Sequence, residues 1–305
     1  MSQQIYEAFC RAVGNREEVL EYEPMKRHTT FCIGGPARYF LSPKDSRELK
    51  AVLSLCRERN YPWFILGNGS NLLVSDRGFD GAVIQIGKGF SGIRAEGNQI
   101  FAGSGALLSA VARKAFEAGL TGLEFAAGIP GTLGGAVVMN AGAYQGEMKD
   151  VISHVRVLTK DGREEEQTPA QLKMGYRSSN IPSRESVVLG AVFTLQPGKR
   201  EDIRARMEEL AARRKEKQPL EYPSAGSTFK RPEGYFAGKL IQDAGFSGFQ
   251  VGGAMVSPKH CGFVVNLGNA SAAEVDSLCR QVAAGVKEKF GVCLEMEVKK
   301  LGDFG

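Results

Sequence analysis

Apolar residues in the first part of the chain follow two patterns: short continuous runs, and positions spaced as on one face of a helix. Residues 37–41 (ARYFL) and 62–66 (PWFIL) are short apolar runs of the kind found in buried strands. Between them, Ser42-Pro43 marks a helix start, and apolar side chains follow at helical spacing: Leu49, Val52, Leu53 and Cys56. A strand, a helix and a second strand predict a βαβ unit. It ends in a tight glycine turn, GNGSN, at residues 67–71.

The middle of the chain, residues 82–160, alternates short apolar runs with glycine turns. One helix is expected at about 105–119, from the apolar spacing of Leu107, Leu108, Val111, Ala112 and Ala115. Two further strands are expected at 151–159 and 186–195. A highly charged helix follows from about residue 200, with a single apolar face formed by Ile203, Met207, Leu210 and Ala211. A largely solvated helix of this kind predicts a domain boundary.

The composition changes after this helix. Residues 219–270 are rich in glycine, proline and aromatic side chains, and a short helix is expected at 236–244, ended by Gly245. Ser271 and Glu274 have the spacing of a capping box. A long amphipathic helix should follow, with Val275, Leu278, Cys279, Val282 and Val286 on its buried face. The last fifteen residues are expected to form a strand.

Composition narrows the function classes. The chain has 305 residues and a net charge of +5, which suits an acidic small ligand, but no dense basic block indicates nucleic acid. No apolar run approaches the roughly 20 residues of a membrane span, and the acidic N-terminal segment is unlike a signal peptide. The six cysteines lack metal-ligand spacing. We therefore expect buried, reduced thiols, no metal site and a cytoplasmic protein.

Two glycine-rich segments are the main candidates for a ligand site: residues 66–74 (LGNGSNLLV) and 129–140 (IPGTLGGAVVMN). Bare backbone lets amide groups approach a phosphate closely. Neither segment has the spacing of a Rossmann fingerprint or a P-loop. Each alone is compatible with simple tight turns, whereas two together favour a phosphate-bearing cofactor. Side-chain hydrogen bonds to it would come from Asn68, Ser70, Asn71 and Asn140.

These segments belong to a wider pattern. The chain resembles the UDP-N-acetylenolpyruvoylglucosamine reductase (UDP-N-acetylmuramate dehydrogenase) family, in its shorter class, which lacks an extra tyrosine-bearing loop. The matching segments run in the family's order: TTFCIGGPARYF (29–40), ILGNGSNLLVSD (65–76), GIPGTLGGAVVMNAGAY (128–144), YRSS (176–179), YPSAGSTFKRP (222–232), AGKLIQDAGFSGFQVGGAMVSPKHCGFVVN (237–266) and LEMEVKKLG (294–302).

The resemblance implies an α+β fold: a vanillyl-alcohol-oxidase/PCMH-type FAD-binding domain of two subdomains plus a smaller α+β substrate-binding domain. The expected limits are 1–85 and 86–200 for the two FAD-binding subdomains and 201–297 for the substrate-binding domain. Residues 298–305 would form a strand that returns to the FAD domain. The oligomeric state stays open, and a monomer is compatible with the sequence.

The resemblance also implies an activity and its cofactors. FAD, reduced by NADPH, would reduce UDP-N-acetylglucosamine enolpyruvate to UDP-N-acetylmuramate, a cytoplasmic step of peptidoglycan precursor synthesis for the cell wall. The partners would be small molecules only. Within the two glycine segments, the implied cofactor-binding residues are Gly67, Asn68, Gly69, Ser70, Asn71, Leu72, Pro130, Gly131, Thr132, Gly134, Gly135, Asn140 and Ala141.

By the same resemblance, Arg177 would bind the substrate carboxylate, Ser227 would deliver a proton, and Glu297 would act as an acid partner. Taken without it, each has an ordinary structural reading: a surface arginine, a turn serine and an exposed strand glutamate. Glu295 competes with Glu297, because residues i and i+2 share one face of a strand. The implied substrate-binding residues are Tyr176, Lys217, Lys230 and His260. The family often has asparagine where this chain has Arg231.

Two other functions compete with this one. A different flavin oxidoreductase of the same superfamily would keep the FAD-binding segments but not the substrate-domain segments around Ser227 and Glu297. A non-catalytic nucleotide-binding protein would keep the fold but have no need for the three candidate catalytic residues together. The presence of all three favours the reductase.

Overall fold

The computed structural model describes residues 2–305, and its chain divides into two compact units. The first unit comprises Met1–Glu21, Tyr39–Asn68 and Gly81–Arg214, of which Met1 lies outside the described residues. The second comprises Tyr22–Arg38, Gly69–Asp80 and Lys215–Gly305. The chain passes between the units several times, so neither is a single stretch of sequence. The domain limits expected from the sequence stay a prediction.

The N-terminal part of the first unit contains the expected strand–helix–strand. Strand β2 (Pro36–Leu41) is followed by α2 (Ser46–Glu58) and β3 (Trp63–Leu66). Strand β5 (Phe79–Gln85) lies between β2 and β3 in the order β1-β2-β5-β3, and it pairs with β3 in parallel. The four predicted apolar positions of α2 are all fully buried. They pack with residues of α1 (Ser2–Val13) and β1 (Val19–Pro24) in one hydrophobic cluster.

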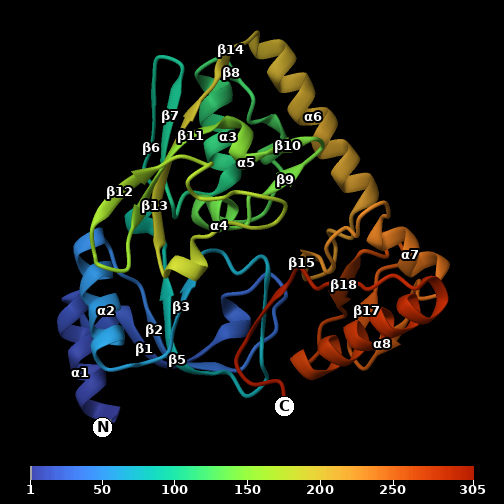
Figure 1. Ribbon diagram of the computed structural model, residues 1–305, viewed down its shortest axis with the longest axis horizontal. Coiled ribbons are helices and arrows are strands. Elements are labelled where there is room, and N and C mark those ends of the chain that lie inside the picture. Colours follow the sequence, from blue (N-terminus) through green and yellow to red (C-terminus); the bar gives the residue numbers. More distant parts are fainter. Residues whose placement is uncertain (1) are drawn as a thin grey trace. The chain divides into compact units, whose positions relative to one another are not determined.

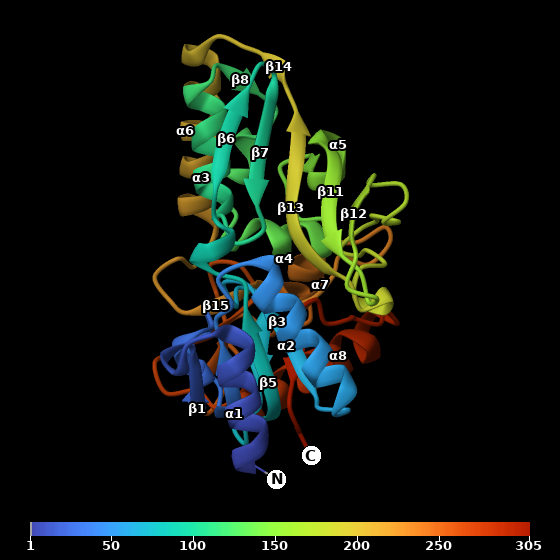
Figure 2. The same ribbon diagram turned by 90° about the vertical axis from the view of Figure 1, so that its left-hand side faces the viewer.

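The larger part of the first unit is a five-stranded antiparallel sheet of order β12-β11-β13-β7-β6. Figure 2 shows these strands side by side. Their bounds are β6 (Ile93–Glu96), β7 (Gln99–Gly103), β11 (Ile152–Leu158), β12 (Glu164–Gln167) and β13 (Val187–Thr194). The helix expected at 105–119 is α3 (Leu108–Glu117), which contacts β6 and β7. Leu107, one of the five apolar positions that predicted this helix, precedes it and is exposed.

Several short elements of the first unit were not expected. The second glycine segment contains a helix, α4 (Leu133–Val138), which packs against β13. After it come β9 (Gly142–Ala143), β10 (Gly146–Glu147) and α5 (Met148–Val151). Strands β8 (Leu120–Thr121) and β14 (Gln196–Pro197) form a two-stranded ladder.

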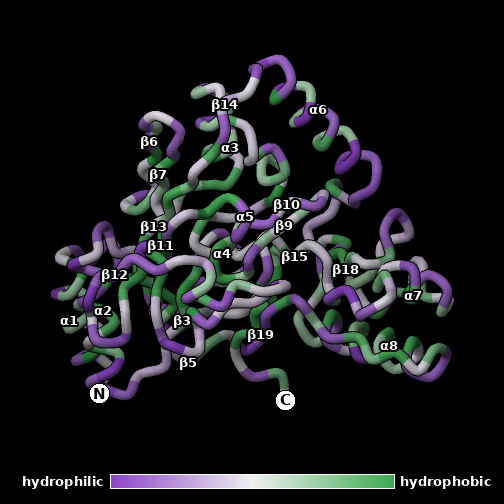
Figure 3. Tube along the Cα trace, turned by 45° about the horizontal axis from the view of Figure 1, so that its top comes forward, coloured by the Kyte–Doolittle hydropathy of each residue, from purple (hydrophilic) through white to green (hydrophobic). Residues whose placement is uncertain are grey.

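The charged helix is α6 (Arg200–Lys217), and much of its length is coloured hydrophilic in Figure 3. Ile203 and Leu210 are buried and Met207 is partly buried, as expected, but Ala211 is exposed. The helix therefore touches the first unit's core with a narrow stripe of apolar side chains. None of the described helices is long and apolar enough to cross a membrane.

The second unit builds its core around the C-terminal helix α8 (Ala272–Phe290), drawn in red in Figure 1. The predicted capping box of Ser271 and Glu274 is confirmed. Strands β15 (Ser224–Ser227), β18 (Phe263–Asn266), β17 (Ala254–Val256) and β16 (Gln250–Val251) form a sheet in that order. Helix α7 (Ala237–Asp243) matches the expected short helix and ends before Gly245.

The tail forms much less strand than expected. Only β19 (Lys299–Leu301) is regular, and it pairs in parallel with β4 (Leu72–Val74), which directly follows the first glycine segment. The thiols also differ in part from expectation. All six cysteines are free, but Cys32 and Cys293 are exposed rather than buried.

Candidate functional site

The two glycine segments meet at Gly67 and Thr132 in the first unit. A Cβ added to Gly67 would lie 2.3 Å from Thr132 Oγ1, far inside van der Waals contact. A side chain at position 67 would therefore require Thr132 to move. The two segments that the sequence selected separately are in contact at this point.

The second glycine segment is fastened to residues 104–108 by backbone hydrogen bonds. Leu108 N donates to Gly131 O (3.1 Å), Leu133 N donates to Ala106 O (2.8 Å), and Gly134 N donates to Ser104 O (2.8 Å). Gly131 has φ +128°, a conformation open to glycine but strained for other residues. Gly135, by contrast, is exposed, and an added Cβ would meet nothing nearer than Thr132 Oγ1 at 4.0 Å. This face of the segment is open.

The rest of the first segment belongs to the second unit. Gly69 has φ +61°, and a Cβ added to it would lie 2.0 Å from His28 O, so a side chain is excluded there. Asn71 donates from Nδ2 to Glu297 O (3.3 Å), and Asn71 O accepts from Lys299 N (3.0 Å). Leu72 is buried at 3% exposure within the β4–β19 pair. Its side chain is therefore part of the buried core of this unit.

Ser227 and Glu297, far apart in sequence, lie on adjoining backbone in the second unit. Glu297 N donates to Thr228 O (2.8 Å), and Phe229 pairs with Met296 in an isolated bridge. Ser227 is exposed at the end of β15. The pairing of β15 with β18 shifts register between Ser224 and Ser227, where Gly226 has φ +77°. An irregularity of this kind redirects the side chain that follows it.

The structure distinguishes Glu295 from Glu297. Glu295 is 71% exposed and forms an ion pair with Lys230, and Lys230 N also donates to Glu295 O (2.8 Å). Glu297 is half-buried and fixed through its main chain on both sides. The i, i+2 argument failed because residues 294–297 do not form a regular strand. Glu297 remains the candidate acid, and Lys230 has Glu295 as its partner.

His260 is held in one tautomer in the second unit. Its Nδ1 accepts a hydrogen bond from Gly262 N (3.1 Å), which leaves the proton of the neutral ring on Nε2. Burial lowers the pKa of His260, so the ring is neutral at pH 7. The ring also packs edge-on against Phe263, the residue paired with Ser227. Lys217, the last residue of α6, is exposed.

Arg177 and Tyr176 lie on a tight turn of the first unit, between Gly175 and Ser178. Arg177 Nη2 donates to Gly142 O (2.9 Å), and its guanidinium carbon is 5.1 Å from the Tyr176 ring centroid. Asn140 is fully buried and its side chain hydrogen bonds to Gly175, Glu147 and Lys149. These protein contacts differ from the cofactor contact expected of Asn140, and that expected role stays a prediction.

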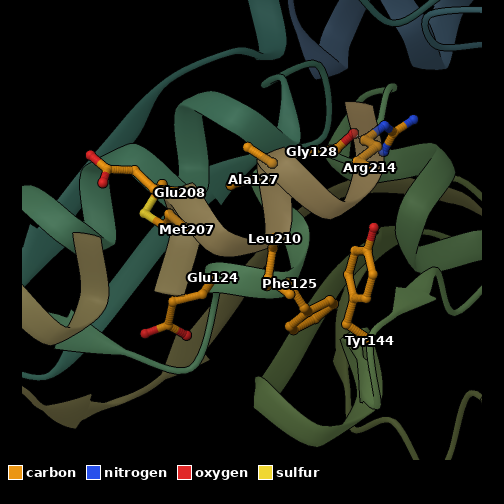
Figure 4. Close-up of a pocket in the computed structure, with 10 residues that line it drawn as sticks. Glu124, Phe125, Ala127, Gly128, Tyr144, Met207, Glu208, Leu210 and Arg214 are labelled. Atoms are coloured by element: carbon orange, nitrogen blue, oxygen red, sulfur yellow. The ribbon is translucent and has the colours of Figure 1, made fainter. Parts of the chain in front are cut away.

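A cavity of about 270 Å³ lies beside the second glycine segment in the first unit. Figure 4 shows the hydroxyl end of Tyr144 directed toward Arg214, a residue of α6 whose guanidinium donates to Gly128 O. Burial lowers the pKa of Arg214. The lining residues are Glu124, Phe125, Ala127, Gly128, Tyr144, Met207, Glu208, Leu210, Ala211 and Arg214. The sequence interpretation missed Tyr144 and Arg214, since nothing local marks either as facing a cavity.

Comparisons with known proteins identify the family of this chain. The family model "FAD binding domain" matches residues 37–167, and "UDP-N-acetylenolpyruvoylglucosamine reductase, C-terminal domain" matches residues 218–301. The UDP-N-acetylenolpyruvoylglucosamine reductase of Agathobacter rectalis is 55% identical over 94% of this chain and 95% of its own. That of Geobacillus kaustophilus is 50% identical over 99% of both chains. The chain belongs to the UDP-N-acetylenolpyruvoylglucosamine reductase family.

Solved structures place the fold. The UDP-N-acetylenolpyruvylglucosamine reductase of Thermus caldophilus has a TM-score of 0.81 at 38% identity, covering 93% of this chain and 98% of that one. The glucose dehydrogenase Phl p 4.0202 has a TM-score of 0.50 at 10% identity, covering 65% of this chain and 44% of that one, a likeness of fold alone. The α+β, FAD-binding fold class predicted from the sequence is confirmed.

The residues of the two glycine segments fit the FAD of this reductase family. Asn68 is exposed and, among residues 2–305, has no hydrogen-bond partner for its main chain or side chain. The buried Oγ of Ser104, behind Gly134, likewise has none among the described residues. Small residues, amide donors and the open face at Gly135 suit a diphosphate and a flat ring. The roles expected of the individual residues stay predictions.

Proposed function

We propose that this chain reduces UDP-N-acetylglucosamine enolpyruvate to UDP-N-acetylmuramate, using FAD as cofactor and NADPH as reductant. The observation that carries the proposal is the convergence of Asn71, Ser227 and Glu297 in the second unit. It joins a cofactor segment to two segments characteristic of the substrate domain. Relatives at about half identity over nearly the whole chain carry the same reductase name.

The chemistry has two requirements beyond hydride transfer. When bound, FAD supplies the hydride, which it obtains from NADPH. Addition at the methylene carbon of the enolpyruvyl group places negative charge on the neighbouring carbon and its carboxylate. The protein must stabilise that charge and deliver one proton to that carbon, so that a lactyl ether results.

Three side chains of this chain suit these tasks. The planar guanidinium of Arg177 would bind the carboxylate through two parallel hydrogen bonds. Ser227 Oγ would give its proton to the carbon, and Glu297 would share a proton with the enolic carboxylate. Fixing the main chain of Glu297 to Thr228 and Asn71 holds it beside the strand end that carries Ser227. A serine needs a neighbour or water to regain its proton.

The remaining substrate contacts follow from charge. Lys217 and Lys230 would meet the diphosphate, Tyr176 would contact the substrate near Arg177, and His260 would donate from Nε2. Gly67 through Leu72 and Pro130 through Ala141 would surround FAD. Because a UDP-sugar and NADPH are cytoplasmic metabolites, we place the enzyme in the cytoplasm. We expect it to act without nucleic-acid or membrane partners.

The test is a Ser227→Ala variant followed through both halves of the reaction. NADPH should still bleach the bound flavin at the wild-type rate, whereas reoxidation by the enolpyruvyl sugar nucleotide should fall by about 10²-fold or more. The proposal would be wrong if the wild-type protein purifies yellow and is reduced by NADPH but is not reoxidised by this substrate. The chain would then be a different flavin oxidoreductase.

A further inference from the structure

The main chain of Arg177 is held in an uncommon conformation. Its φ of +52° lies in the left-handed region, which a long side chain rarely occupies. The turn around it is closed by hydrogen bonds from Gly175 N to Ser178 O (3.0 Å) and from Ser178 N to Gly175 O (3.3 Å). A residue in such a conformation persists only where its surroundings fix it. The conformation of Arg177 is therefore fixed by the residues around this turn.

Asn140 provides the central contact. It is fully buried, and its Nδ2 donates both to Gly175 O (3.0 Å) and to Glu147 Oε2 (3.0 Å). Its Oδ1 accepts from Lys149 N (2.9 Å). Both amide hydrogens are thus used within the protein. Asn140 itself has φ +41°, a conformation that asparagine tolerates better than most residues.

The same stretch holds the turn at two further points. Gly142 O accepts from Arg177 Nη2 (2.9 Å), and Ser179 Oγ donates to Val138 O (2.8 Å). On the other side of these contacts, Val138 O, Asn140 Nδ2 and Gly142 O lie within residues 138–142, which comprise the end of the second glycine segment and the two residues after it. The turn that carries Arg177 is therefore fixed to the segment proposed to lie on FAD.

Glu147 is the negatively charged residue next to Asn140. Its carboxylate pairs with Lys149 Nζ (2.8 Å) and accepts a hydrogen bond from Asn140 Nδ2. These two contacts and, to a smaller extent, the positive charge of Arg177 lower the pKa of Glu147. Gly142 also lies against it, since an added Cβ there would be 2.9 Å from Glu147 Cγ. Glu147 thus holds Asn140 from one side while Gly175 holds it from the other.

We propose that Asn140 and Glu147 are positioning residues that set the location of the Arg177 guanidinium for the substrate carboxylate. This rests on the proposed function, in which Arg177 binds that carboxylate. Asn140 acts through the carbonyl of Gly175, and Glu147 acts through Asn140 and through its charge. Neither needs to touch the substrate. An error of about 1 Å in the position of such a group is enough to lower a rate by about 10²-fold.

The test uses the flavin-loaded enzyme and the isosteric Asn140→Asp, which replaces the two N–H donors by an oxygen facing Gly175 O and Glu147. Stopped-flow absorbance follows reduction by NADPH and reoxidation by the enolpyruvyl sugar nucleotide separately. The ratio of the reoxidation rate to the flavin-reduction rate should fall by roughly 10- to 100-fold. Glu147→Gln, which keeps an acceptor for Asn140 but loses the charge, should give a smaller loss in the same half-reaction.

Asn266→Asp is the matched control for a generally destabilising effect. Asn266 is also buried, donates from Nδ2 to a carbonyl (Phe31 O, 3.0 Å), and accepts from Gly268 N (2.8 Å) and Ala270 N (3.0 Å) through Oδ1. The control variant should lower the unfolding temperature without changing the ratio of the two half-reaction rates. Equal changes of that ratio in both variants would overturn the proposal.

A double variant tests whether Asn140 acts through Arg177. If it does, Arg177→Ala/Asn140→Asp should reoxidise no more slowly than Arg177→Ala alone, because the position being set no longer matters. Additive losses would overturn the proposal. Wild-type enzyme that fails to reduce the substrate would instead reject the proposed function. Wild-type activity with an unimpaired Asn140→Asp would reject only the positioning role.

Discussion

The side-chain amide of Asn71 donates to the main-chain carbonyl of Glu297, with 3.3 Å between Nδ2 and O. The contact spans 226 residues of sequence and is continued by the parallel pairing of β4 with β19. The last residues of the first glycine segment and the candidate acid are thus parts of one backbone assembly. A substitution in this part of the first glycine segment should therefore also shift the main chain of Glu297.

The two glutamates near the C-terminus should behave differently when neutralised. Glu297→Gln should slow substrate reduction by about 10²-fold or more, because it removes the proposed acid partner. Glu295→Gln should leave kcat within about threefold, since it removes only an exposed ion pair with Lys230. Steady-state kinetics of the two variants, made in parallel, decides this. A larger loss of kcat in Glu295→Gln would reverse the assignment.

Because Gly67 and Thr132 are in contact, a substitution that weakens FAD binding at one position should be partly compensated by a substitution at the other. Gly67→Ala places a methyl group 2.3 Å from Thr132 Oγ1 and should weaken FAD retention during gel filtration. Adding Thr132→Ala removes that oxygen and should restore part of the retention. Gly92→Ala, where an added Cβ meets nothing within 4 Å, is the control. If the double variant retains no more FAD than Gly67→Ala, the close approach at this point is wrong.

The exposed cysteines should be alkylated faster than the buried ones. Burial raises the pKa of both Cys56 and Cys279 to about 12, so these thiols are not ionised at neutral pH and should resist alkylation in the folded protein. Cys32 and Cys293 are exposed and should react first. Mass spectrometry after a short iodoacetamide pulse, with and without denaturant, reads each site. Rapid native labelling of Cys279 would contradict the packing of α8.

His260 should contribute to the acid sensitivity of the fold. Burial lowers the pKa of its ring below the ordinary 6.5, so the unfolded chain takes up a proton there before the folded protein does. The stability that depends on the neutral ring is fully present above about pH 6.5 and is lost as the pH falls toward the lowered pKa. His260→Asn, which keeps an acceptor for Gly262 N, should remove this part of the dependence.

Urea unfolding measured at about pH 7.5 and about pH 5.5 checks the effect of His260. The wild-type midpoint should fall more than that of His260→Asn between the two conditions. His154→Asn, a change at an exposed histidine, should parallel the wild type. Equal shifts in wild type and His260→Asn would show that the ring is not buried as the structure has it.

Long helices with clear signals were predictable from the sequence. Apolar spacing identified α2 and α8, and the capping box of Ser271 and Glu274 marked the start of α8. The start of α2 was placed slightly early, because Asp45, not Ser42-Pro43, caps it by accepting from Glu48 N (2.8 Å). Apolar spacing and capping residues are reliable signals because they depend on residues that are close together in the sequence.

Short and strained elements were not predictable. Helix α4 has no side-chain cap and two glycines in six residues, so neither propensity nor capping marks it. The regular part of the tail is only three residues long, since its pairing depends on β4. Both features are set by distant backbone, which no local pattern records.

The candidate site was predictable only in part, for a similar reason. The glycine segments are visible as composition, and the family resemblance identified Arg177, Ser227 and Glu297 by motif. The protein contacts of Asn140, the left-handed turn at Arg177 and the pairing of Glu295 with Lys230 arise between segments far apart in sequence. Sequence patterns identified the candidate residues, but they could not identify the residues that hold those candidates in place.

Single-turnover reoxidation of the NADPH-reduced, flavin-loaded enzyme with UDP-N-acetylglucosamine enolpyruvate, in the absence of oxygen, isolates the proposed reduction from every other step. The proposed reduction requires that the flavin absorbance returns in one rapid phase and that one equivalent of UDP-N-acetylmuramate forms. A flavin that stays reduced in the presence of this substrate, with no lactyl ether produced, would contradict it.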